Sequence, residues 1–181
     1  MAICAGACMA LALPGPGLFP LVLAVPGFLR RSLEGRRGWA AARTGFLAGF
    51  AQWTIAVPWV VIVLHRYGHA PLPVAVAGWL AMSAILATTW ALASWATCLC
   101  RREWVTWLLP LALVACEVLQ GYPPWHFPWN PVSATATAWW PLLLPLPVVG
   151  SAGLSLLVLA VGGALDALWA HGMRRRGAFQ L

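Results

Sequence analysis

Hydrophobic residues occupy the chain in long blocks, and these blocks predict its main elements. A helix needs about 20 residues to cross the roughly 30 Å hydrocarbon core of a membrane. Four apolar blocks reach or approach that length: Thr44–Leu64, Leu72–Leu99, Trp104–Gly121 and Val148–Trp169. The pattern therefore predicts several membrane-spanning helices joined by short polar connections.

Two shorter apolar segments, Ile3–Leu13 and Leu18–Leu29, precede these blocks and are separated by the sequence Pro14-Gly15-Pro16-Gly17. Alternating proline and glycine predicts a turn, because proline lacks an N–H and clashes inside a helix. As a helix, the first segment would rise only about 17 Å, which is too short to span comfortably. We expect the two segments to form either a shallow hairpin or the clipped start of a longer first helix.

Three residues inside the first long block predict how it packs. Pro58 predicts a kink, since a proline in a helix interior removes a backbone hydrogen bond. Gly45 and Gly49 lie four residues apart, a spacing that permits close contact with another helix in a membrane.

The positions of the arginines predict the orientation of the helices. The chain has 11 basic residues, all of them arginine, and four acidic residues. With one crossing per block, ten arginines fall on one side of the membrane, and only Arg66 falls on the other. Such an excess marks the cytoplasmic side. The clustered arginines are Arg30, Arg31, Arg36, Arg37, Arg43, Arg101, Arg102, Arg174, Arg175 and Arg176. We expect the Arg66 loop and the segment Tyr122–Pro147 to face outward.

The composition supports this interpretation and excludes other classes of protein. The chain of 181 residues is 62% hydrophobic and 8% charged, whereas soluble domains are about 25% charged. The net charge of +7 does not indicate nucleic-acid binding, because the arginines lie in short clusters between apolar blocks. The absence of lysine excludes chemistry that requires a lysine of this chain.

The outward segment carries the candidate chemistry. Prolines at four positions between Tyr122 and Pro131 prevent a regular helix, while three aromatic residues keep this segment apolar. It is either an interfacial loop with tryptophan anchors or a half-inserted loop at the mouth of a lipid-facing pocket. Glu117 precedes it near the end of a predicted span, where a carboxylate either faces a partner in the bundle or reaches the interface. Gln52, Gln120 and His126 are the candidate partners.

Other chemistry is poorly supported. His65, His69 and His126 lie on the outward side, but Gly68 and Pro71 break the helix that a zinc-binding His-x3-His pair would need. The chain's serines lie in no Gly-x-Ser-x-Gly nucleophile motif. Asp166 lies near the end of the last block, and we expect it to form an ion pair with Arg174–Arg176.

Three ordered motifs together resemble the N-terminal membrane region of the apolipoprotein N-acyltransferase family. The first is Trp59-Val60 followed by Tyr67-Gly68-His69-Ala70-Pro71. The second is Glu117-x-x-Gln120-Gly121 followed by Phe127-Pro128-Trp129-Asn130-Pro131. The third is Gly150-x-x-Gly153-Leu154-Ser155. The chain departs from the family pattern at Gln120, where the family has arginine, and at His126, where it has glycine.

The resemblance implies acyl transfer from a phospholipid to the N-terminal cysteine of a lipoprotein, through a thioester on a cysteine. In that family the cysteine belongs to a Glu-Lys-Cys triad in an outward nitrilase-like domain, which this sequence does not contain. We therefore expect a truncated or split membrane module that is not catalytic alone. The expected substrate-binding residues are Trp59, Tyr67, Glu117, Gln120, His126, Phe127, Pro128 and Trp129.

The sequence thus predicts an all-α, polytopic membrane bundle of about five to six transmembrane helices with an outward Pro/Trp-rich re-entrant loop. Residues 1–173 form the expected membrane domain, and residues 174–181 a short cytoplasmic basic tail. We expect a bacterial inner-membrane location, no metal or cofactor, and membrane phospholipid as a partner. Lipoprotein substrate and a separate nitrilase-like chain are further candidate partners. The alternative is a non-enzymatic membrane protein, such as a small-solute binding or transport subunit.

Overall fold

The computed structural model of the chain describes the backbone of residues 1–178 and the side chains of residues 1–102 and 104–171. All regular elements among these residues are helical, which confirms the predicted all-α class. The α-helices in chain order are α1 (Ala2–Ala12), α2 (Val25–Leu33), α3 (Gly38–Ala56), α4 (Trp59–Ile62), α5 (Leu72–Thr97), α6 (Val105–Leu119) and α7 (Leu146–Ala178).

Short helical turns of other types connect these helices. Segment η2 (Val63–Tyr67) is a π-helical turn that continues α4. The 3-10 turns are η1 (Phe19–Ala24), η3 (Arg102–Trp104), η4 (Val132–Ala138) and η5 (Trp140–Leu143). No α-helix forms between α6 and α7 because the prolines of this stretch prevent one.

The number of helices able to cross a membrane is not confirmed at five to six. By length and hydropathy, α5 and the Leu146–His171 part of α7 qualify among the described residues. A third span is possible if α3 and the segment Trp59–Tyr67 count as one, although they are bent by 55°. Helices α1 and α6 are apolar but have only 11 and 15 residues, so each rises less than about 25 Å.

Proline and glycine break the helices where the sequence predicts. Helix α3 ends before Pro58, which produces the predicted kink. The segment around Pro14 and Gly15 forms the predicted turn, and α1 and α2 pack against each other as a hairpin. At Gly150 the backbone is non-helical, with φ 67°, so the helical axis of α7 is interrupted near its start.

Glycine and other small residues let the central helices approach closely. A Cβ atom at Gly45 would lie 2.3 Å from the Trp90 carbonyl oxygen, and one at Gly6 would lie 1.9 Å from the Ala48 carbonyl oxygen. Helix α3 therefore packs directly on the backbone of α5, and α1 packs on α3. This confirms the prediction that Gly45 and its neighbour Gly49 mark a close helix contact.

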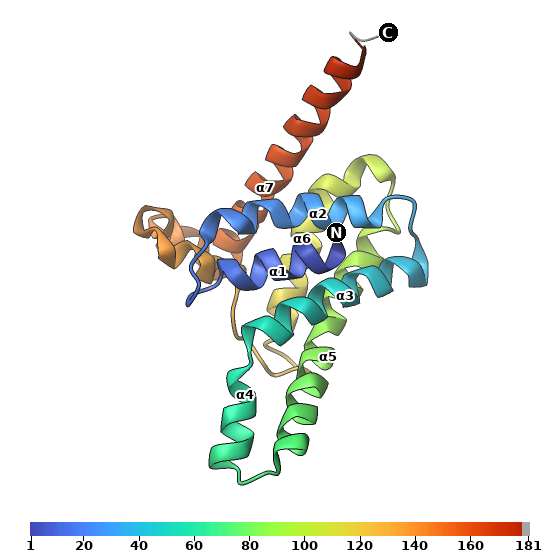
Figure 1. Cartoon of the computed structure of the whole chain (residues 1–181). Coiled ribbons are helices and arrows are strands. Elements are labelled where there is room, and N and C mark those ends of the chain that lie inside the picture. Colours follow the sequence, from blue (N-terminus) through green and yellow to red (C-terminus); the bar gives the residue numbers. More distant parts are fainter. Residues whose placement is uncertain (179–181) are drawn as a thin grey trace.

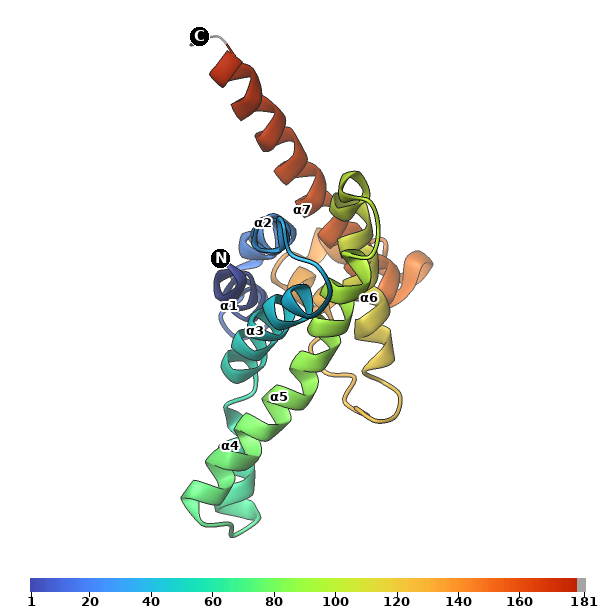
Figure 2. The same cartoon turned by 90° about the vertical axis from the view of Figure 1, so that its right-hand side faces the viewer.

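The helices give the molecule two distinct ends. In Figures 1 and 2 the hairpin of α4, η2 and the start of α5 projects from one end, and the C-terminal half of α7 projects from the other. Because η2 contains Arg66, this arginine lies at the end opposite the connection between α5 and α6, which carries Arg101 and Arg102.

Candidate functional site

Glu117 is at the centre of a hydrogen-bonded network near the end of α6. Its Oε1 atom accepts a hydrogen bond of 2.8 Å from the Ser155 hydroxyl on α7. Its Oε2 atom accepts one of 2.7 Å from the backbone N–H of Val132, the first residue of η4. The carboxylate thereby joins α6 to two other segments, through residues that lie 15 and 38 positions later in the sequence.

Two further serines extend this network. The Ser155 hydroxyl oxygen accepts a hydrogen bond of 2.9 Å from the backbone N–H of Ser133. The hydroxyls of Ser133 and Ser151 lie 2.7 Å apart, within hydrogen-bonding distance. A serine network of this kind can hold a loop against a helix where water is scarce, because each polar group has a partner.

The prediction that Glu117 pairs with Gln52, Gln120 or His126 is wrong, because its carboxylate bonds Ser155 and Val132. The Gln120 side chain instead donates a hydrogen bond of 3.0 Å to the Thr89 hydroxyl on α5. The backbone carbonyl of Gln120 accepts one of 2.7 Å from the N–H of Phe127. Gln120 therefore ties the following loop to α5, while Glu117 ties it to α7. The sequence could not separate these roles, since both side chains are polar and lie one helical turn apart.

Aromatic side chains form a cluster beside this network. The ring centroids of Phe127 and Trp129 lie 5.7 Å apart in a stacked arrangement, and those of Trp59 and Trp129 lie 5.2 Å apart. Trp53 packs edge-on against Phe127 at 6.0 Å. Trp59 and Trp129 remain 36% and 53% exposed. The cluster thus has a buried side, formed by Trp53, and an accessible aromatic surface, formed by Trp59 and Trp129.

The other predicted site residues lie at the surface. His126 and Pro128 are exposed in the same loop, and Tyr67 is 72% exposed at the end of η2. Neither His126 nor Tyr67 has a side-chain hydrogen bond or ion pair among the described residues. The structure therefore brings together Trp59, Phe127 and Trp129, with Glu117 and Gln120 supporting their loop.

A cavity of about 30 Å³ lies between α3 and Glu117. It is lined by Gln52, which is only 4% exposed and whose Oε1 atom has no hydrogen-bond partner among the described residues. Trp53 also lines this cavity, and its buried Nε1 atom has no hydrogen-bond partner among the described residues. A polar cavity of this size has room for one water molecule.

Asp166 forms an ion pair, as predicted, but with different arginines. Its Oδ2 atom lies 2.6 Å from the Arg30 Nε atom, and its Oδ1 atom contacts the Arg31 guanidinium. The side chains of Arg174–Arg176, the predicted partners, lie outside the described residues. Because α2 and α7 pack together, two residues 136 positions apart in sequence become neighbours.

Sequence reasoning missed several residues that organise the site. Ser155 carries a sequence signal only as part of the motif Gly150-x-x-Gly153-Leu154-Ser155, and Thr89 carries none, because a threonine in an apolar helix commonly bonds its own backbone. Within the described residues, no group of three or more His, Cys, Asp or Glu could hold a metal ion. The aromatic cluster is suited to non-covalent binding of an apolar ligand, and the hydrogen-bonded network around Glu117 holds its loop in place.

Comparisons with known proteins identify a family. Residues 5–164 match the family described as Apolipoprotein N-acyltransferase N-terminal domain. The chain is 34% identical over 133 residues to the apolipoprotein N-acyltransferase of Nitrosomonas europaea and 33% identical over 141 residues to that of Azotobacter vinelandii. Each alignment covers 71% of this chain and 26% of the relative.

The apolipoprotein N-acyltransferase of Pseudomonas aeruginosa is 32% identical over 171 residues, which covers 91% of this chain and 33% of the relative. The chain thus spans between 26% and 33% of the length of these curated relatives.

Proposed function

The chain belongs to the apolipoprotein N-acyltransferase family, as an integral membrane protein that matches its N-terminal domain, and from this premise we propose that it holds the phospholipid acyl donor. In this proposal the bound lipid supplies an acyl group for the N-terminal cysteine of a lipoprotein. The observation that carries it is the aromatic cluster of Trp59, Phe127 and Trp129, with its accessible surface.

The cluster suits the part of a lipid where the acyl chains meet the glycerol. Trp and Phe rings supply large apolar areas, and tryptophan is enriched at the level of lipid headgroups. Phe127 is held in position because its N–H donates to the Gln120 carbonyl and its ring packs on Trp53, and Trp129 stacks on Phe127. His126 and Pro128 form the exposed rim of the loop, where a headgroup or a lipoprotein substrate would make contact. Tyr67 is exposed at the end of η2 and would contact lipid separately from this rim.

We propose that the acyl-transfer step itself uses residues other than these 181. By resemblance, the family's nucleophile is a cysteine supported by a glutamate and a lysine, and this sequence has no lysine. Cys116, next to Glu117, is buried on α6 and has no basic side chain hydrogen-bonded to it among the described residues. A nitrilase-like unit on other residues would supply the thiolate, and the cluster would present the lipid to it.

The first test measures lipid contact. The purified chain is placed in nanodiscs that contain a phospholipid with a photoactivatable acyl chain, and cross-linked peptides are identified by mass spectrometry. We expect cross-links in the loop that carries Phe127 and Trp129. In a Trp59→Ala/Trp129→Ala variant the yield of these cross-links should fall about threefold to tenfold, since an aromatic contact is worth about 0.5–1.5 kcal/mol.

The matched control is Trp140→Ala, which removes an exposed tryptophan from η5 and should leave the cross-links in the loop unchanged. Equal cross-linking in all three proteins would contradict the proposal. In the same nanodiscs, a phospholipid with a tagged acyl chain should leave no hydroxylamine-sensitive label on the protein. Such a label would reveal an acyl-thioester and would show that these residues catalyse the first step themselves.

A further inference from the structure

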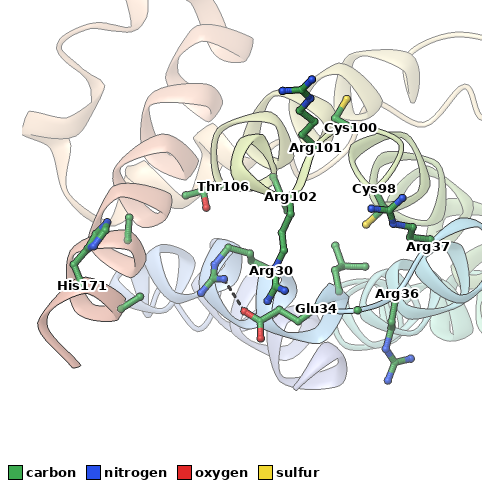
Figure 3. A pocket seen from close by; sticks show the side chains of 15 residues that line it. Arg30, Glu34, Arg36, Arg37, Cys98, Cys100, Arg101, Arg102, Thr106 and His171 are labelled. Carbon is green, nitrogen blue, oxygen red and sulfur yellow. Dashed lines mark hydrogen bonds and ion pairs between the residues drawn. The ribbon is translucent and has the colours of Figure 1, made fainter. Parts of the chain in front are cut away.

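A second, much larger cavity lies at the arginine-rich end of the molecule. Its volume is about 850 Å³, and it lies between the end of α2, the connection from α5 to α6, and α7 (Figure 3). Five arginines line it, together with a single described carboxylate, that of Glu34. The arginines are Arg30, Arg36, Arg37, Arg101 and Arg102.

Among the described side chains, the two carboxylates near this cavity, Glu34 and Asp166, both form ion pairs with arginines of α2. Arg30 contacts Glu34 at 2.8 Å through Nη1 and Asp166 at 2.6 Å through Nε. Asp166 also contacts Arg31. By contrast, Arg37 and Arg102 have no carboxylate partner among the described side chains. The cavity therefore has an excess of positive charge that the described residues do not neutralise.

Figure 3 shows how these cations are arranged. Arg102 extends from the connection between α5 and α6 toward Arg30 and Glu34, and Arg37 lies across the cavity beside Cys98. A concave site with like charges on its walls concentrates the electric field inside it. Guanidinium groups bind phosphate oxygens through paired hydrogen bonds, so a phosphate group is the anion that fits this arrangement.

The surroundings of the cavity indicate where the phosphate would come from. Three exposed tryptophans, Trp39, Trp104 and Trp169, lie within two residues in sequence of residues that line the cavity, as expected for residues at the level of lipid headgroups. The Arg31 guanidinium lies 4.4 Å from the centroid of the Trp169 ring. Helix α7, which lines one side of the cavity, also exposes Leu165 and Leu168, and these side chains provide apolar surface for acyl chains.

We propose that this cavity binds the phosphate headgroup of an anionic phospholipid, with Arg37 and Arg102 as the principal contacts. Basic pockets between membrane helices are suited to anionic headgroups. The site is separate from the aromatic cluster, because Thr106 and Glu117 lie about 16 Å apart along α6 at 1.5 Å per residue. It therefore does not depend on the proposed acyl-donor site.

The test uses the chain in nanodiscs of phosphatidylcholine, with and without phosphatidylglycerol. Cys100 lines the cavity and is exposed, whereas Cys4 is exposed on α1. We expect phosphatidylglycerol to slow maleimide labelling of Cys100 several-fold and to leave Cys4 unchanged, as resolved by peptide mass spectrometry. Equal labelling of Cys100 in both lipid compositions would overturn the proposal, and this arm needs no substitution.

A second arm measures retained lipid by native mass spectrometry. The Arg37→Gln/Arg102→Gln variant should bind phosphatidylglycerol about tenfold more weakly or worse, because it loses charge-assisted hydrogen bonds. Arg66→Gln at the opposite end should bind like the unmodified chain, and circular dichroism checks that both variants fold. If Arg66→Gln weakened binding equally, the effect would reflect general charge and the proposal would fail.

A third arm distinguishes the lipid from a soluble phosphate compound. Glycerol phosphate is added to the chain in phosphatidylcholine nanodiscs. We expect no protection of Cys100 at concentrations where phosphatidylglycerol protects it. Protection by glycerol phosphate, without any by phosphatidylglycerol, would overturn the assignment to a lipid headgroup.

Discussion

Glu117 shows how a single carboxylate can organise a segment that lacks regular structure. A carboxylate in a membrane segment costs about 2.5–3.5 kcal/mol on insertion scales. This cost is offset by two hydrogen bonds, from the Ser155 hydroxyl and the Val132 N–H. Because these donors belong to α7 and η4, the carboxylate holds the segments that follow the Pro/Trp-rich loop against α6.

A double-mutant cycle on Glu117 and Ser155 tests this role. We expect Glu117→Gln and Ser155→Ala each to lower the free energy of unfolding by about 1–3 kcal/mol, since each leaves a buried polar group without its partner. The double variant should lose less than the sum, with a coupling of about 0.5–3 kcal/mol. Unfolding of the chain in detergent micelles, followed by circular dichroism, supplies the measurement.

The control for this cycle is Glu34→Gln, which removes a more exposed carboxylate that pairs with Arg30 four residues earlier. Exposed pairs of this kind contribute at most about 1 kcal/mol, so the loss of stability should be smaller. Strict additivity of Glu117→Gln and Ser155→Ala would show that their hydrogen bond does not hold α6 and α7 together.

At the scale of elements, close packing rather than amphipathic patterning positions the helices. Helices α3 and α5 have no distinct polar face, so a difference in polarity between their faces cannot select which side packs inward. The glycine positions instead determine which side packs inward, because two helix backbones can approach this closely only where a Cβ is missing. The Trp90 carbonyl oxygen against Gly45 is the clearest example.

Gly45→Ala tests this packing. Its new methyl group would meet the Trp90 carbonyl oxygen and the Ser94 hydroxyl at 2.3 Å, and backbone cannot move aside as a flexible side chain can. We expect a loss of about 1–3 kcal/mol in the free energy of unfolding. At Gly78→Ala the nearest atom is the end of the Leu64 side chain at 2.8 Å, so this variant should lose much less. Similar losses from both would contradict the prediction.

At the scale of the whole molecule, charge is distributed unequally between the two ends. The cavity of about 850 Å³ gathers five arginines from two separate clusters, whereas Arg66 lies on the projecting hairpin at the other end. We propose that the arginine-rich end faces the cytoplasm of a bacterial cell. The exposed aromatic loop would then be presented toward the outer side of the inner membrane.

Cysteine labelling in oriented membranes tests this orientation. One variant keeps Cys100 as its only cysteine, and a second replaces all five and carries Tyr67→Cys on η2. A membrane-impermeant maleimide added outside spheroplasts should label the second variant and spare the first until the membrane is permeabilised. Labelling of both from the same side would contradict the proposed topology, and a permeant maleimide controls for the reactivity of each thiol.

The sequence alone determined the features that depend on local chemistry. The apolar blocks predicted helices, the alternation around Pro14 and Gly15 predicted a turn, and Pro58 predicted a kink; the structure confirms each. The motifs that include Trp59 and Trp129 indicated the family, which the match over residues 5–164 confirms. The structure does not confirm the five to six spans that the block lengths predicted, because the first long block breaks before Pro58 and α6 has only 15 residues.

Only the tertiary structure decided which distant side chains meet. Glu117 pairs with Ser155, and Asp166 with Arg30, across 38 and 136 residues, and two arginine clusters line one cavity. These pairings follow from the order in which the helices pack. In long helices without a distinct polar face, such as α3 and α5, no periodic pattern encodes that order; close backbone contacts and the few buried polar groups select it.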